Sequence, residues 1–78
     1  MVNTELLDCA IDKKGLKRGF LALKLHIDRS TFWKKATNQA EFLASEISTL
    51  SKLLDLSTEE KDVIFFNEEF TDSKQEGA

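Results

Sequence analysis

The chain of 78 residues contains no proline and only three glycines, at positions 15, 19 and 77. Proline breaks a helix and glycine weakens it, so the sequence has few residues that oppose helix formation. Apolar residues recur at spacings of three and four, and the regular alternation that a half-buried strand requires is absent. These features predict an all-α fold.

Composition limits the class of protein further. Hydrophobic residues make up 41% of the chain and charged residues 32%, values typical of one small globular domain. No apolar run approaches the ~18 residues of a membrane span, and no signal peptide opens the sequence. Cys9 is the only cysteine, which excludes an intramolecular disulfide and indicates a reducing compartment. We expect a cytoplasmic protein without a membrane partner, with Cys9 buried or half-buried as a small filler.

Capping residues and apolar spacing predict five helices. The first is expected to begin near Asn3 or Thr4 and to stop at Gly15. A second helix is expected over 17–25, and a third over 29–37 with Asp28 as its N-cap. After a left-handed Asn38, the fourth lies within 41–54. The fifth is expected to begin at the capping box of Ser57 and Glu60 and to run to residue 70.

The spacing also assigns an inward face to each helix. The residues expected there are Leu6, Leu7, Ala10, Ile11, Leu21, Ala22, Leu25, Phe32, Ala36, Ile47, Leu50 and Leu54.

The net charge of −3 hides an uneven distribution of charge. Residues 13–38 carry eight lysines and arginines against Asp28 alone, a local charge of +7. Residues 1–12 and 39–78 are both acidic. Because nucleic acids respond to the local field of a patch, this segregation favours nucleic-acid binding, against which the net charge alone would argue.

The third helix has an outer side suited to a DNA major groove if Phe32 and Ala36 face inward. That outer side carries Arg29, Ser30, Trp33, Lys34 and Thr37. Arginine and lysine read guanine edges or bind phosphates, and serine hydrogen-bonds either donors or acceptors. Lys17 and Arg18 open the second helix, where the first helix of a helix-turn-helix crosses the DNA backbone.

Simpler interpretations stay open at this point. The basic helix could be solvated surface alone, and Trp33 could pack against the fourth helix as core. His26 is a turn residue with no second histidine or nearby cysteine, so no metal site is expected. We expect no cofactor, no small-molecule ligand and no catalytic residue, because the chain lacks a Cys/His cluster and a phosphate-binding glycine loop.

The stretch "LALKLHIDRSTF" and its continuation to Phe66 resemble a known family. They are similar to small phage and prophage Cro/cI-type repressors with the lambda-repressor-like helix-turn-helix fold, in particular short Cro-like forms from prophages of Gram-positive bacteria. The resemblance covers about residues 4–67. It implies a compact five-helix domain over 1–70, with the helix-turn-helix at about 17–37. The polar composition of 71–78 predicts a flexible tail.

The resemblance also implies roles for single residues. Arg18 falls where the family contacts phosphate or a base edge, and Arg29, Ser30 and Lys34 fall at base-contacting positions. Trp33 occupies an exposed position beside them, and Gln39 matches a position that contacts the DNA backbone. His26 replaces the usual glycine of the turn, a departure that strains the turn if a positive φ is required.

The run "VIFF" at 63–66, with Phe70 after it, bears on assembly. Four consecutive apolar residues sweep most of a helix circumference, so one inward stripe cannot bury them all. Either this helix is wedged between its neighbours, or Phe65, Phe66 and Phe70 meet a second copy in a homodimer that reads a palindromic operator.

The leading hypothesis is a sequence-specific regulator of transcription that binds double-stranded DNA, a Cro-like repressor of a phage or prophage in a bacterial host. The alternative is a protein-interaction module, antirepressor-like or antitoxin-like, that keeps this fold without specific DNA binding. An enzyme is not expected.

Overall fold

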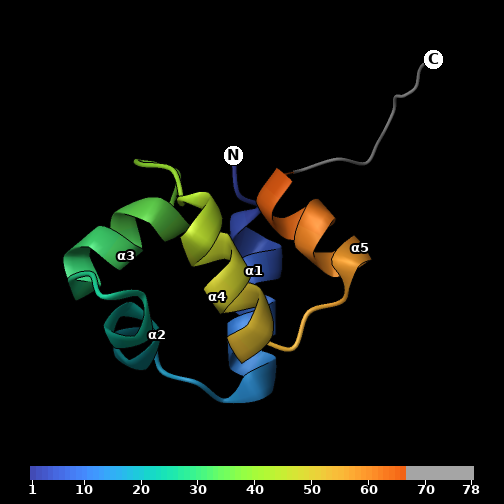
Figure 1. Ribbon diagram of the computed structural model, residues 1–78, viewed down its shortest axis with the longest axis horizontal. Coiled ribbons are helices and arrows are strands. Elements are labelled where there is room, and N and C mark those ends of the chain that lie inside the picture. The colour runs from blue at the N-terminus through green and yellow to red at the C-terminus, as the bar shows by residue number, and fades with distance from the viewer. Residues whose placement is uncertain (67–78) are drawn as a thin grey trace.

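A computed structural model describes residues 1–66, and these residues are all-helical, with no strand among them. The elements are α1 (Thr4–Lys14), α2 (Arg18–Leu25), α3 (Arg29–Ala36), α4 (Ala44–Leu53), α5 (Thr58–Lys61) and a π-helical turn, η1 (Asp62–Phe66). In Figure 1, α1 and α4 occupy the middle, with α2 and α3 on one side and α5 on the other. The all-α prediction is confirmed.

Local capping marks both ends of α1 and the start of α5, as the sequence predicts. The Asn3 side chain accepts a hydrogen bond from the Leu6 N–H at 3.1 Å, and Gly15 ends α1 in a left-handed conformation with φ 70°. Ser57 and Glu60 exchange hydrogen bonds of 2.9 and 3.1 Å at the start of α5. Each of these interactions spans only a few residues, so each is visible in the sequence.

Two helices differ from the prediction. The α4 helix begins at Ala44, later than expected, and Leu43 at its N-cap offers no side-chain acceptor. The Glu46 carboxylate accepts the Leu43 N–H at 2.9 Å, so half of a capping box forms without a polar N-cap residue. The α-helical part of the fifth helix ends at Lys61, and the chain widens into η1. Its expected continuation over 67–70, and the expected tail at 71–78, lie outside the described residues.

One core joins α1, α2, α3, α4 and η1. Its buried apolar residues are Val2, Leu7, Ile11, Leu21, Ala22, Leu25, Phe32, Leu50, Leu54, Ile64 and Phe65. Phe42 lies edge-on to Phe32 at 5.9 Å between ring centroids and edge-on to Phe65 at 5.7 Å. This chain of three rings connects α3 to η1. The Asn3 N–H donates to the Ile64 carbonyl at 2.6 Å and holds η1 against the start of α1.

Two residues of α1 are more exposed than predicted. Leu7 and Ile11 are fully buried and mark the inward face. Successive residues of a helix are about 100° apart, so Cys9 lies on the opposite side and is exposed. Leu6 lies at the edge of the face and retains 39% of its surface. The expected burial of both residues was therefore wrong.

The apolar run in η1 is divided between core and surface. Ile64 and Phe65 are each 5% exposed, whereas Phe66 is 47% exposed. Phe65 belongs to the core, which corrects the prediction that its ring meets a second copy of the chain. Phe66 remains available to a partner, and Phe70 lies outside the described residues. The turn is thus wedged between its neighbours, as the simpler interpretation expected.

Replacement of Phe65 by alanine should lower the free energy of unfolding by about 3 to 5 kcal/mol, because it leaves a cavity beside Phe42. Phe66→Ala is the matched control and should cost clearly less, because 47% of Phe66 is exposed. Urea unfolding followed by circular dichroism measures both. Equal losses for the two variants would contradict the assignment of Phe65 to the core.

Candidate nucleic-acid interface

The turn between α2 and α3 places the two helices against each other. His26 has a φ of 61°, a left-handed conformation that costs a residue with a side chain about 1 to 2 kcal/mol. The Ile27 N–H donates to the Ala22 carbonyl at 3.1 Å, and Ile27 packs half-buried against the core. Asp28 precedes α3 at the N-cap position, but its side chain makes no capping hydrogen bond.

The α3 helix presents its predicted outer side to solvent. Phe32 is 2% exposed and Ala36 packs against the core, which confirms the predicted inward face. The residues exposed on the remaining surface of α3 and at its end include Arg29, Ser30, Trp33, Lys34 and Thr37. Trp33 retains 57% of its surface, so it is not part of the core.

A hollow of about 520 Å³ lies where α1, α2 and α3 meet, and we name it the α1–α3 hollow. Its lining is Thr4, Asp8, Arg18, Arg29, Ser30, Phe32, Trp33, Ala36 and Thr37. The structure therefore gathers five of the predicted DNA-contacting residues around one depression. Lys17, Lys34 and Gln39 lie outside this lining, although all three are exposed.

Arg18 is held by two carboxylates of α1. Its Nη2 lies 3.0 Å from Asp8 Oδ1, and its Nη1 lies 3.4 Å from Asp12 Oδ1. The hydrogen bond to Asp8 is the main cause that raises the pKa of Arg18 above its ordinary value. Arg18 is thus a cation already paired within the chain, a feature that the sequence analysis did not identify.

Gly19 allows close contact between α2 and the side chain of Arg29. A Cβ atom at position 19 would lie 3.3 Å from Arg29 Cδ and 3.4 Å from its Nε. With another residue at this position, the arginine side chain would have to move by a few tenths of an ångström. The glycine that weakens the helix therefore lets the Arg29 side chain lie close against α2.

Lys35 is turned inward, although it contributes to the basic segment of the sequence. Its Nζ lies 2.6 Å from Glu46 Oε1, and the two side chains are only 12% and 8% exposed. Lys35 and Phe32 lie about 60° apart around α3, so Lys35 projects toward α4 and away from the outer side. This buried ion pair joins α3 to the start of α4.

The end of α3 is fixed by side-chain hydrogen bonds. The Thr37 hydroxyl donates to the Trp33 carbonyl at 2.7 Å, and its oxygen accepts from Gln39 Nε2 at 3.5 Å. Asn38 has a φ of 69°, as predicted, and its side chain bonds both the N–H and the carbonyl of Val2 at 2.8 and 2.9 Å. These bonds hold the segment that carries Gln39 against the N-terminus.

Five cations of the basic segment make no ion pair within residues 1–66. Within residues 1–66, the ion pairs involve Lys14, Arg18 and Lys35. The other cations of the segment are Lys13, on α1, and Lys17, Lys24, Arg29 and Lys34, at or on α2 and α3. Of these, Lys24 lies over the Phe20 ring at 5.4 Å, so Lys17, Arg29 and Lys34 are the cations best placed to meet an anion.

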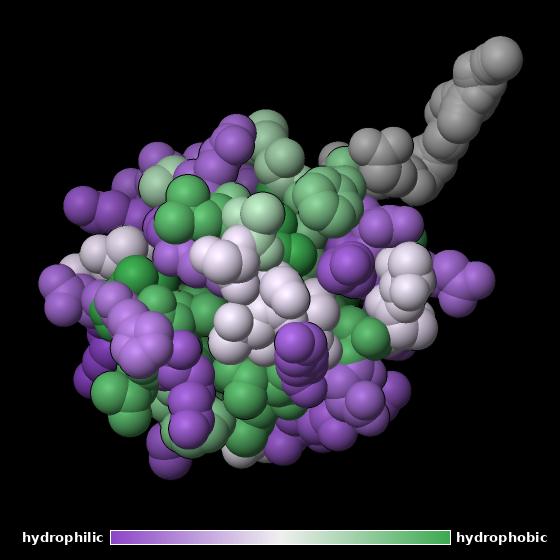
Figure 2. Space-filling model, viewed as in Figure 1, coloured by the Kyte–Doolittle hydropathy of each residue, from purple (hydrophilic) through white to green (hydrophobic). Residues whose placement is uncertain are grey.

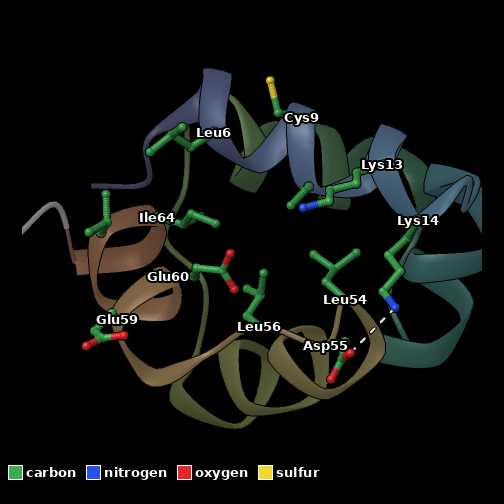
Figure 3. A pocket seen from close by; sticks show the side chains of 12 residues that line it. Leu6, Cys9, Lys13, Lys14, Leu54, Asp55, Leu56, Glu59, Glu60 and Ile64 are labelled. Atoms are coloured by element: carbon green, nitrogen blue, oxygen red, sulfur yellow. Dashed lines mark ion pairs between the residues drawn. The ribbon is translucent and has the colours of Figure 1, made fainter.

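A second depression, of about 570 Å³, lies between α1 and the segment from Leu54 to Ile64, and we name it the α1–α5 groove (Figure 3). Its walls are mainly apolar, and the Lys14–Asp55 ion pair of 3.7 Å crosses one end. Lys13 extends into the groove in this view. In the described part of the chain, no group of His, Cys, Asp and Glu side chains is arranged to hold a metal ion.

Comparisons with protein-family models, with curated proteins and with solved structures find no match to the chain. None of the helices in residues 1–66 combines the length and the apolar character that crossing a membrane requires. Function is therefore inferred from the side chains of α2 and α3.

Lys35→Met should lower the free energy of unfolding by about 3 kcal/mol, because it leaves the Glu46 carboxylate buried without its cation. Lys34→Met removes the same charge from an exposed position and should have little effect. Thermal unfolding measures both variants. Adding Glu46→Gln to Lys35→Met should recover part of the loss, and failure to recover any would argue against an uncompensated charge as its cause.

Proposed function

We propose that the chain binds double-stranded DNA, with α2 and α3 acting as a helix-turn-helix and α3 lying in the major groove. The observation that carries the proposal is the division of α3 into a buried side at Phe32 and an exposed side with two unpaired cations, Arg29 and Lys34. The role that fits best is sequence-specific control of transcription, as in the Cro/cI-type repressors that the sequence resembles.

The chemistry of α3 supports base recognition. Arginine can donate two parallel hydrogen bonds to a guanine, and this contact discriminates against other bases by about 1 to 3 kcal/mol. Arg29 lies at the start of α3, the end of a recognition helix that contacts base edges. Ser30 is exposed beside it, and Lys34 lies one turn further along. Lys17 precedes α2, where it can neutralise a phosphate.

A homodimer on a palindromic operator remains part of the proposal. One recognition helix covers only a few base pairs, and two helices about 34 Å apart read the two halves of a palindrome. Because Phe65 is buried, Phe66 replaces it as the aromatic ring that a second copy would contact.

An interaction module is the second candidate, and exposed apolar side chains favour it. Leu23 is 69% exposed and Phe20 is 39% exposed, both on α2. Figure 2 shows apolar side chains interspersed with charged ones over the part of the surface where α2 and α3 lie. A protein partner on α2 would cover this surface and leave the chain without affinity for DNA.

Selection of genomic DNA fragments with the purified protein separates the two candidates. DNA binding predicts enriched fragments that share a short motif, and an affinity for them that falls as salt rises. A chain that enriches no fragment, or whose retained DNA carries no shared motif, would reject sequence-specific binding. Enrichment of no fragment at all would favour the interaction module.

Arg29→Ala should weaken binding to the selected site by about 1 to 3 kcal/mol and relax discrimination at one base pair. Arg29→Lys keeps the charge but loses the planar fork, so it should lose most of the discrimination as well. Fluorescence anisotropy on the selected site and on single-base variants measures both. Equal losses on selected and random duplexes would make Arg29 a phosphate contact.

Lys17→Ala should weaken binding to all duplexes by a similar factor. The slope of log K against log salt should fall by about 0.9, the value for one phosphate contact. Lys61→Ala removes a lysine from the end of α5, away from α2 and α3, and should leave the slope unchanged. Titrations at several salt concentrations measure the slope, and an unchanged slope for Lys17→Ala would remove α2 from the interface.

A further inference from the structure

Two carboxylates of α1 hold a cation that DNA binding would use. We propose that Asp8 and Asp12 compete with DNA phosphate for the guanidinium of Arg18 and so limit the affinity of the chain for the DNA backbone. The inference rests on the proposed function, because it concerns the same α2–α3 surface. It assigns a role to residues of α1, a helix that neither the sequence motif nor the exposed side of α3 includes.

The geometry places both carboxylates on the same guanidinium. Asp8 and Asp12 are four residues apart and therefore lie on one face of α1. Each bonds a different terminal nitrogen of Arg18, at 3.0 and 3.4 Å. The parallel N–H groups with which an arginine grips a phosphate are thus already engaged within the chain.

Local charge gives the competition its direction. One guanidinium faces two carboxylates, so the cluster carries a net charge of −1 where the start of α2 would meet the DNA backbone. Lys17 beside it makes no ion pair within residues 1–66 and stays available to phosphate. Of the neighbouring cations Lys17 and Arg18, only Arg18 forms ion pairs within residues 1–66.

Exposure makes the exchange reversible. The side chains of Arg18, Asp8 and Asp12 retain 45%, 58% and 73% of their surface. Exposed ion pairs are weak because water and salt screen them. A phosphate can therefore displace the carboxylates, but it must overcome their attraction for Arg18 and their repulsion of its own charge.

The test compares two double variants with the same change in net charge. Asp8→Asn with Asp12→Asn releases Arg18 and keeps the size of both side chains. Glu41→Gln with Glu59→Gln removes two exposed acids that form no ion pair within residues 1–66 and is the matched control. The measurement is the affinity of each protein for a random-sequence 20-base-pair duplex at 50 and 200 mM salt.

Release of Arg18 should add one phosphate contact. The slope of log K against log salt should steepen by about 0.9, so the ratio of affinities at the two salt concentrations should grow by a factor of about 3.5. The control pair should leave this ratio unchanged. The gain should be lost when Arg18→Gln is added, because the competition acts through that side chain.

Four results would overturn the proposal. Weaker binding by the Asp8→Asn, Asp12→Asn protein, with unchanged circular dichroism, would mean that the carboxylates orient Arg18 for DNA. A gain that persists with Arg18→Gln would reduce their effect to general repulsion. If the unaltered protein binds the duplex but the Asp8→Asn, Asp12→Asn protein shows no steeper salt slope, the competition alone is rejected. If none of the proteins binds the duplex, the proposed function is rejected together with the competition.

Discussion

Burial of Phe32 is the constraint on which the candidate interface depends. Its ring is 2% exposed and lies edge-on to Phe42, which in turn lies edge-on to the buried Phe65. Because residues of a helix are held about 100° apart, one buried ring fixes the rotation of the whole α3 helix. The Lys35–Glu46 ion pair holds the same helix from a second side. With Phe32 and Lys35 held by these contacts, the side chains of Ser30 and Lys34 face solvent.

The folded chain divides the basic segment into cations with different uses. Lys35 is taken into a buried ion pair, Lys14 pairs with Asp55, and Arg18 pairs with Asp8 and Asp12. The cations of the segment that make no ion pair within residues 1–66 are Lys13, Lys17, Lys24, Arg29 and Lys34. Charge counted along a sequence therefore overstates the charge that a partner meets, because opposite charges from other helices neutralise part of it.

At two positions close to the interface, the residue present is not the one that the local backbone conformation favours. Glycine at position 19 weakens α2 by about 1 kcal/mol relative to alanine, yet a Cβ there would crowd Arg29. His26 adopts a left-handed conformation that glycine would adopt with less strain. His26 forms the turn between α2 and α3, and Gly19 lets the Arg29 side chain lie against α2. Departures from local preference are expected where geometry serves a site.

The sequence by itself determined the helical class, most helix ends and the outer side of α3. Caps such as Asn3 and the Ser57–Glu60 box act over a few residues, and apolar spacing identifies Phe32 as inward, so no distant contact is needed. Only the tertiary structure decided that Arg18 is paired, that Lys35 is buried, and that Phe65 is core while Phe66 is surface. These outcomes depend on the angles at which helices distant in sequence pack, and a pattern along one chain carries no information about those angles.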